Sequence, residues 1–435
     1  MQTSRRTFVR GLAAAGVALP AFPAFREDAF ARLFRANAIA GNRPAASVAE
    51  DELYWSEIQR AFDADRTMIN LNNGGVSPTP SHVLEQMIRD LKFTNELPVE
   101  HMWRILQPRM ESTRRELAKE FGCDAEEMAI VRNASEALEI MIYGLDLRRG
   151  DEVVVTNQNY GRMITTWQQR ERREGIVLKQ ISFKVPPPSD DYIVDQFRAA
   201  LTPRTRVIEV THITNLTGQI MPVRKIVDMA RPHGIEVFVD GAHAFGHWPM
   251  KRDDLGVDYY GTSLHKWLHA PIGAGFLYVR RDRIPALWPL MAAAEAQAHD
   301  IRKYEEIGTH PQANFNAVSA ALAFSQGMGL DRKIARLRYL RDRWAKRLLA
   351  ESDRVHVLTQ LGPDKSGAIC LFTVDGLDPV KLGGWLASKY RIVNTPIVHP
   401  EFSGIRITPS IYTSVEEIDT FTDAVLTAIK SGIAT

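Results

Sequence analysis

The chain has few cysteines, and the two it has are poorly placed for the usual structural roles of this residue. Cys123 and Cys370 are the only cysteines among 435 residues, and the sequence pattern puts them in different lobes. Two such residues cannot form a disulfide framework. Neither stands in a ligand spacing with histidine, so no zinc site or other metal site is predicted. We expect two free thiols.

An excess of charge of either sign is also missing. The 54 basic and 52 acidic side chains nearly cancel, so no global field favours nucleic acid or an anionic membrane surface. The basic run from Arg332 to Arg343 alternates with apolar residues at helical spacing, which is typical of a solvated helix face. The balance favours a small-molecule partner and no nucleic acid.

No long apolar run is present, and the N-terminus resembles a targeting signal instead. The residues Ser4-Arg5-Arg6-Thr7-Phe8 precede a weakly apolar stretch over residues 11–25, a pattern typical of a twin-arginine signal. That stretch is shorter than the about 20 apolar residues that span a bilayer, so no stable membrane anchor is expected. Small residues at 36–40 offer cleavage sites, and a basic disordered terminus is the alternative.

We therefore predict that residues 1–40 are a signal peptide, an address rather than part of the fold. The predicted partner is the twin-arginine export machinery, and the predicted location is periplasmic or otherwise exported.

The body of the chain alternates short apolar runs with amphipathic helical stretches. Seven runs read as strands, at residues 128–131, 152–156, 177–181, 206–211, 237–239, 259–262 and 274–279. Such alternation predicts a mainly parallel sheet covered by helices on both faces. Beyond about residue 311 two helices, short strands and a terminal helix predict a smaller α+β domain. We expect an N-terminal arm at 41–80, a large domain at 81–310 and a small domain at 311–435.

One segment carries an acid and an amine at a suggestive distance. A strand-like run ends at Asp240, and the turn after the next such run delivers Lys266. A pyridoxal phosphate enzyme needs both groups, a carboxylate for the pyridine nitrogen and an amine for the Schiff base. A helix-capping aspartate and a solvated lysine are the alternatives. A nicotinamide dehydrogenase is a poor match, because no Gly-x-Gly-x-x-Gly turn follows an early strand.

Two motifs occur in order, Asp240-Gly-Ala-His243 and then Ser263-Leu-His265-Lys266. With them the chain resembles the class V aminotransferase family, from about residue 70 to the C-terminus. The histidine at 243 resembles the branch of the isopenicillin N epimerases, since desulfurases usually carry glutamine there. The resemblance implies an α/β enzyme of fold type I with a mainly parallel large domain and a smaller α+β C-terminal domain. It also implies pyridoxal 5′-phosphate as the cofactor, with Asp240 and Lys266 as the catalytic pair.

The resemblance further implies a phosphate site. Ala134 and Ser135 open a helix and would present their amides to the phosphate, with Ser263 and His265 beside them. Thr309 matches the family element that reaches a phosphate across a dimer interface, which implies a homodimer with shared active sites. By themselves these residues read as a helix cap and a turn.

The remaining expected site residues face the cofactor ring and the substrate. Tyr160 matches the aromatic that stacks on the pyridine face, while Asn215 and His243 would bond the 3-oxygen side of the ring. Arg406 interrupts an alternating strand and matches the clamp for the substrate carboxylate. Asn73 belongs to a loop that resembles the family's N-terminal substrate loop. The alternatives are core packing for Tyr160, a core histidine for His243, a structural salt bridge for Arg406 and a simple turn for Asn73.

The sequence narrows the reaction. Desulfurases need a reactive cysteine on a mobile loop, and the corresponding stretch at 394–404 has none. What remains starts with removal of an α-proton by Lys266 from an amino acid or a peptide-borne amino group bound to the cofactor. Return of a proton to the opposite face gives epimerisation and requires a second acid, Tyr160 or His243, whereas return to the cofactor gives transamination.

We predict epimerase-like chemistry. The alternatives are an aminotransferase, or an enzyme that tailors a secreted peptide or siderophore-like metabolite. A desulfurase and a non-catalytic binding protein on the same fold rank below them.

Overall fold

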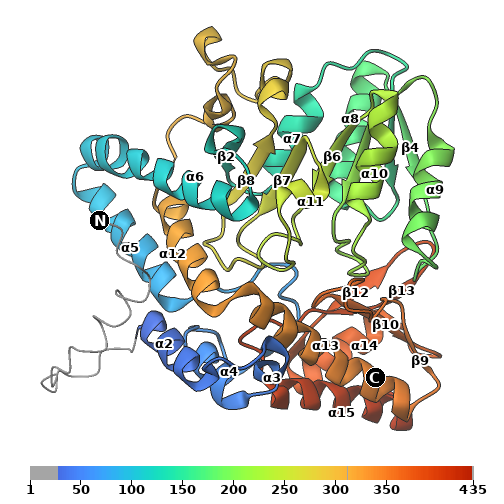
Figure 1. Cartoon of the computed structure of the whole chain (residues 1–435). Helices are drawn as coiled ribbons and strands as arrows, with labels where there is room; N and C mark the ends of the chain where they lie inside the picture. The colour runs from blue at the N-terminus through green and yellow to red at the C-terminus, as the bar shows by residue number, and fades with distance from the viewer. Residues whose placement is uncertain (1–27, 311, 434–435) are drawn as a thin grey trace, which may run out of the picture.

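The structure is a computed structural model that describes residues 28–310 and 312–433. It consists of a large domain around a central sheet and a smaller domain around the C-terminal strands and helices (Figure 1). The predicted twin-arginine motif lies outside the described residues.

The central sheet has seven strands in the order β2-β8-β7-β6-β5-β3-β4. Their bounds are β2 Met128–Val131, β3 Glu152–Thr156, β4 Val177–Ile181, β5 Thr205–Thr211, β6 Glu236–Asp240, β7 Tyr259–Ser263 and β8 Gly275–Val279. Five strands, β3 to β7, pair in parallel, and β8 runs antiparallel to both neighbours. All seven predicted runs are strands, within a residue or two of the expected bounds, and the mainly parallel sheet is confirmed.

Helices cover both faces of this sheet because its strands are apolar on both sides. Along β3, Val153 and Val155 join one buried cluster while Val154 joins the other, as the alternation of a strand requires. The helices are α5 Ser81–Glu96, α6 Gln107–Phe121, α7 Ala134–Gly144, α8 Gly161–Glu174, α9 Asp190–Ala200, α10 Val223–Ala230 and α11 Arg252–Leu255, with a π-helix at Val99–Leu106. Single 3-10 segments lie at Ala125–Glu127, Arg231–His233, Arg281–Ala286, Glu295–Gln297 and Ile301–Glu305.

The smaller domain has a four-stranded antiparallel sheet in the order β12-β13-β10-β9. Its elements are α13 Leu330–Glu351, β9 Val355–Val357, β10 Cys370–Val374, α14 Pro379–Tyr390, β12 Thr395–Val398, β13 Ser403–Ile407 and α15 Val415–Ser431. Phe421 meets Trp344 and Phe372 edge to face between helices and sheet, and the Trp344 and Phe372 rings are tilted against each other. The expected α+β domain is present, but β12 was not predicted from the sequence.

Two contacts cross the predicted domain boundaries. Helix α12 (Gln312–Met328) follows residue 310, yet its Val318 and Leu322 pack in the core of the large domain. Strand β1 (Ile69–Asn70), in the predicted arm, pairs in parallel with β11 (Ile392–Val393) of the small domain. The core of the large domain therefore extends past residue 310, and the small domain includes a piece of the arm.

The segment before the arm is also folded. Residues Ala29–Ala40 form α2, and two shorter helices follow, α3 Ala45–Ala49 and α4 Glu52–Gln59. Helix α2 buries Leu33 and Ala36, and the Asn37 amide donates to the carbonyl of Gly327 at 2.9 Å. The expectation that the first forty residues are an address without structure is thus wrong for residues 28–40, because this helix has an apolar face that packs on the body of the protein. None of the described helices is long and apolar enough to cross a membrane.

Candidate active site

A cavity of about 310 Å³ opens at the carboxyl ends of the parallel strands, where sites of α/β proteins commonly form. It is lined by Gly74, Gly75, Asn133, Ala134, Ser135, Leu138, Tyr160, Thr211, Asn215, Asp240, Ala242, His243, Ser263, His265, Lys266 and Arg406. Ten of the twelve residues predicted from the sequence are in this lining; Asn73 and Thr309 are not. The structure thus brings most of the predicted site together.

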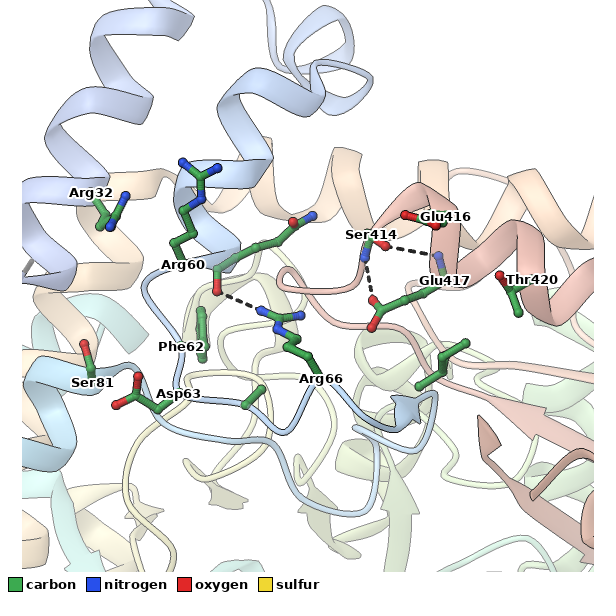
Figure 2. A pocket seen from close by; sticks show the side chains of 13 residues that line it. Arg32, Arg60, Phe62, Asp63, Arg66, Ser81, Ser414, Glu416, Glu417 and Thr420 are labelled. Carbon is green, nitrogen blue, oxygen red and sulfur yellow. Dashed lines mark hydrogen bonds between the residues drawn. The ribbon is translucent and has the colours of Figure 1, made fainter. Parts of the chain in front are cut away.

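A second hollow, of about 840 Å³, lies between α4 and the start of α15 and contains none of the predicted residues (Figure 2). Several of its charged groups are engaged by the protein itself. Arg66 donates to the carbonyls of Gln59 at 2.8 Å and Tyr412 at 3.1 Å. Figure 2 shows Ser414 and Glu417 joined by reciprocal hydrogen bonds. Volume alone does not identify the site.

Lys266 lies in the turn after β7 with its amine in the cavity. Burial lowers the pKa of Lys266 to about 8; the carboxylate of Asp240 opposes this effect and the Arg406 cation adds to it. The amine nitrogen is 3.1 Å from Nε2 of His243. A lysine with a depressed pKa is a nucleophile and a base near neutral pH, as a Schiff-base lysine must be.

Asp240 is the last residue of β6 and is almost completely buried. One of its carboxylate oxygens accepts the amide of Ala242 at 2.9 Å. Burial raises the pKa of Asp240, while that hydrogen bond and Lys266 lower it. The next residue must be glycine, because a Cβ at Gly241 would lie 2.0 Å from the ring of Tyr260. The backbone is thereby fixed so that the carboxylate ends the strand facing the cavity.

The start of α7 forms one wall. Asn133 caps the helix by accepting the amide of Glu136 at 2.9 Å, and the amide of Ala134 donates to the Ser263 hydroxyl at 2.9 Å. Burial, together with Lys266, lowers the pKa of His265 to about 4, so its ring is neutral. A helix N-terminus with a hydroxyl and an imidazole beside it suits an anion such as a phosphate.

Arg406 reaches the cavity from β13 of the small domain. Its guanidinium donates to the carbonyl of Asn215 at 2.8 Å and to the side chain of Asn72 at 2.7 Å. Within residues 28–310 and 312–433 it forms no salt bridge to a carboxylate, and burial lowers its pKa to about 10. A buried cation with no anionic partner in the described chain is suited to a carboxylate from a ligand.

Several buried polar atoms around the cavity have no hydrogen-bond partner in the described chain. They are Thr211 Oγ1, Asn215 Oδ1, His265 Nδ1 and Arg406 Nε. Each such atom costs about 1–3 kcal/mol if it is left unpaired. Pyridoxal phosphate with an amino-acid substrate offers a phosphate, a phenolic oxygen, a ring nitrogen and a carboxylate. The residues present therefore fit this cofactor, with the acid and the lysine at its ring and α7 at its phosphate.

Two predicted residues have other surroundings. Asn73 is completely buried, and its side chain donates to the carbonyls of Asn70 and Thr408. Its neighbour Asn72 is the residue that contacts Arg406. Thr309 is exposed and lies outside the cavity lining.

Thr211 was not predicted from the sequence, although a signal was available. It ends β5 and pairs in register with Asp240 at the end of β6. The ends of neighbouring parallel strands lie at one edge of the sheet, so a polar residue in that position was a candidate.

The cysteines are poorly suited to catalysis. Cys370 is buried in β10, and Cys123 follows the glycine that ends α6. Burial raises the pKa of each thiol to about 12. Neither would be a thiolate near neutral pH. In the described residues no cluster of three or more histidine, cysteine, aspartate or glutamate side chains is arranged for a metal ion.

Comparison with known proteins agrees with this geometry. Residues 69–421 match the family model described as aminotransferase class-V. The chain belongs to the class V aminotransferase family. It is therefore a pyridoxal phosphate-dependent enzyme of fold type I, and the predictions of family, fold and cofactor are confirmed.

Members of this family with different activities are similar to the chain. An isopenicillin N epimerase of Streptomyces clavuligerus is 30% identical over 85% of this chain and 97% of its own length. A cysteine desulfurase of Haloferax volcanii is 26% identical over 83% of this chain and 90% of its own length. The solved structure of the cysteine desulfurase CsdA of Escherichia coli superposes with a TM-score of 0.74 at 20% identity, covering 86% of this chain and 98% of that one. Both epimerases and desulfurases are thus among its relatives.

Proposed function

We propose that this enzyme removes the α-proton of an amino acid, free or at the end of a peptide, and returns a proton to the opposite face. The observation that carries the proposal is the hairpin of β12 and β13, which occupies the stretch where desulfurases need a cysteine and has none. Elsewhere, Cys370 is buried and Cys123 is partly buried, and burial raises the pKa of both thiols, so both are protonated. The similarity to isopenicillin N epimerases supports the same choice.

The chain supplies the groups for this chemistry. Pyridoxal phosphate, when bound, withdraws electrons from the α-carbon and so acidifies its hydrogen. Asp240 holds a proton on the ring nitrogen, Arg406 orients the substrate through its carboxylate, and Lys266 takes the α-proton.

Inversion needs a second acid on the side opposite Lys266. His243 lies beside the lysine, 3.1 Å from its nitrogen, so it shares the lysine's side. Tyr160 lines the cavity from the start of α8 and is 41% exposed. We propose its phenol as the second acid, because it is a proton donor in the cavity wall that solvent can reach.

The test is to incubate the enzyme with D- and L-amino acids and short peptides in deuterated water. Epimerisation predicts that the opposite enantiomer forms with deuterium at the α-carbon, as followed by mass spectrometry and chiral chromatography. Tyr160→Phe should keep α-proton exchange and lose inversion, whereas Tyr143→Phe, outside the cavity, should change neither. A keto acid formed with an amino acceptor would instead show transamination, and sulfide release from cysteine would overturn the choice.

We also propose that the enzyme is a homodimer whose active sites include residues of both copies. Helix α5 exposes Leu84, Ile88 and Leu91 on one stripe, and Trp103 of the following π-helix is 47% exposed. Such a contiguous apolar stripe is typical of an interface. Thr309, outside the cavity of its own chain, is the residue proposed to enter the partner's site. Ile88→Glu should shift the mass measured by light scattering from dimer to monomer.

We also propose that the protein is exported by the twin-arginine route, from the pair Arg5 and Arg6 and the weakly apolar stretch that follows them. Replacing Arg5 and Arg6 together by lysine should retain the protein in the cytoplasm, measured by cell fractionation, if the twin-arginine route is used. Unchanged fractionation would contradict the proposed periplasmic location.

A further inference from the structure

Trp267, the residue after the catalytic lysine, is held in a single orientation. Its side chain is completely buried. The indole lies on the ring of His247, with centroids 3.8 Å apart and planes 16° apart, and the carbonyl of Trp267 accepts the amine of Lys333. In this position the indole nitrogen donates to Nδ1 of His243 at 3.2 Å.

This hydrogen bond determines which nitrogen of His243 carries the proton. An indole N–H can only donate, so Nδ1 must be the acceptor. Burial holds the pKa of His243 well below its usual value, so the ring is neutral. A neutral imidazole with an unprotonated Nδ1 has its proton on Nε2.

The proton on Nε2 in turn constrains Lys266. The two nitrogens are 3.1 Å apart, and because Nε2 donates, the lysine nitrogen must accept. Only an unprotonated amine has the lone pair to do so. We propose that Trp267 is a positioning residue: by fixing the Nε2–H form of His243, it favours the neutral amine of Lys266, the form that can bond the carbonyl carbon of the cofactor.

That bonding step is balanced within the site. The lysine nitrogen forms a double bond to the aldehyde carbon, and the carbonyl oxygen leaves as water with the two amine protons. An ammonium has no lone pair and must first lose a proton. Keeping the amine neutral therefore increases the rate of cofactor capture.

Other groups around Lys266 act on the same equilibrium. Asp240 from β6 favours the ammonium, and Arg406 from β13 opposes it. His265 is the remaining imidazole near the amine, and its ring is neutral. The uncharged Trp267–His243 pair thus favours the neutral amine of Lys266, against the effect of the Asp240 carboxylate.

The inference uses only the part of the proposed function that makes Lys266 the cofactor lysine. It does not depend on whether the product is an epimer or a keto acid, so a failed substrate assay would leave it standing.

The first experiment measures the rate at which the apoenzyme captures pyridoxal phosphate. Absorbance follows the reaction at a series of pH values. In Trp267→Phe, His243 can move its proton to Nδ1 and accept from the ammonium, so the apparent pKa of Lys266 should rise by about one unit and capture at neutral pH should slow about tenfold. Trp344→Phe is the matched control. Trp344 is also completely buried, but its indole nitrogen has no partner in the described chain, and its replacement should shift neither value.

A double-variant cycle separates the histidine from packing. A leucine at position 243 has no hydrogen-bonding group, so adding Trp267→Phe to His243→Leu should produce no further shift of the lysine pKa. The same shift in both backgrounds would mean that Trp267 acts through packing and would overturn the proposal. An unchanged pKa in Trp267→Phe alone would overturn it as well.

A second measurement uses the wild-type apoenzyme and holds even if Trp267→Phe does not fold. With ¹⁵N-labelled histidine, the signals of His243 are those lost in His243→Gln. The proposal requires protonated Nε2 and unprotonated Nδ1 at neutral pH. A proton on Nδ1, or on both nitrogens, would refute it.

Discussion

The two hollows of the molecule differ in how their walls are bonded. The larger one, beside α15, has charged side chains held by the protein's own groups, such as Arg66 on two carbonyls and Glu417 on Ser414. The smaller one contains a lysine, an arginine without an anionic partner in the described chain, and buried polar atoms that lack hydrogen bonds. The larger hollow also has a buried atom without a hydrogen bond, Nε2 of Gln59. What distinguishes the smaller one is that several such atoms surround a buried cation and a lysine of lowered pKa, a combination that a bound anionic ligand would complete.

The largest effect expected in the smaller hollow is that of Lys266→Ala. Borohydride reduction should no longer attach the cofactor covalently to the chain, as measured by mass spectrometry after denaturation. Turnover should fall on the order of 10⁴-fold, because nucleophile and base are lost together. Lys303 is also buried but lies outside the cavity, and in Lys303→Met borohydride should still attach the cofactor. If borohydride still attached the cofactor covalently to the Lys266→Ala chain, the basis of the site assignment would be removed.

Asp240→Asn should be next. The amide keeps the size of the side chain but cannot hold the ring nitrogen protonated, so kcat should fall about 10²- to 10³-fold while the cofactor still binds. Absorbance titration and steady-state kinetics measure the two effects separately. Turnover equal to wild type would show that the acid only caps the turn after β6.

Arg406→Lys should act on substrate binding. Lysine keeps a positive charge but loses the planar pair of donors, so KM should rise about 10- to 100-fold with a smaller change in kcat. Arg343→Lys, which affects a half-exposed ion pair with Asp419, is the control and should leave KM unchanged. If KM in Arg406→Lys were as low as in Arg343→Lys, Arg406 would have a structural role and not a substrate-binding one.

The smallest effect is expected in the larger hollow. Arg60→Ala removes an ion pair between an exposed arginine and Glu57, which keeps Arg32 and Arg35 as partners, so the loss should be about 0–1 kcal/mol. Activity should be unchanged and the midpoint of urea unfolding should move little. A clear loss of activity would break the comparison between the two hollows.

Much of the site could be predicted because its residues follow strands. Asp240 ends β6, and Lys266 follows β7. Local patterns locate strand ends, and the geometry of a parallel sheet then brings these residues to one edge. The bounds of the seven strands were accessible for the same reason.

The rest depended on contacts between segments far apart in the sequence. Whether Asn72 or Asn73 reaches the cavity is decided by pairing with the small domain, since Asn72 forms a bridge with Thr408. The burial of α2 depends on α4 and α12, which no local pattern reveals. The link from Trp267 to His243 joins two loops of the large domain and gave no signal in the sequence.

The pairing of β1 with β11 also bears on the order in which the protein is made. Ile69 leaves the ribosome roughly 320 residues before its partner Ile392. At about 5–20 residues per second, that interval is roughly 15 to 65 s. During this time the beginning of the chain has no edge to pair with, so the site, which takes Gly74 from one end and Arg406 from the other, can be completed only at the close of synthesis. A chain truncated near its C-terminus would therefore lose the cavity wall at both ends.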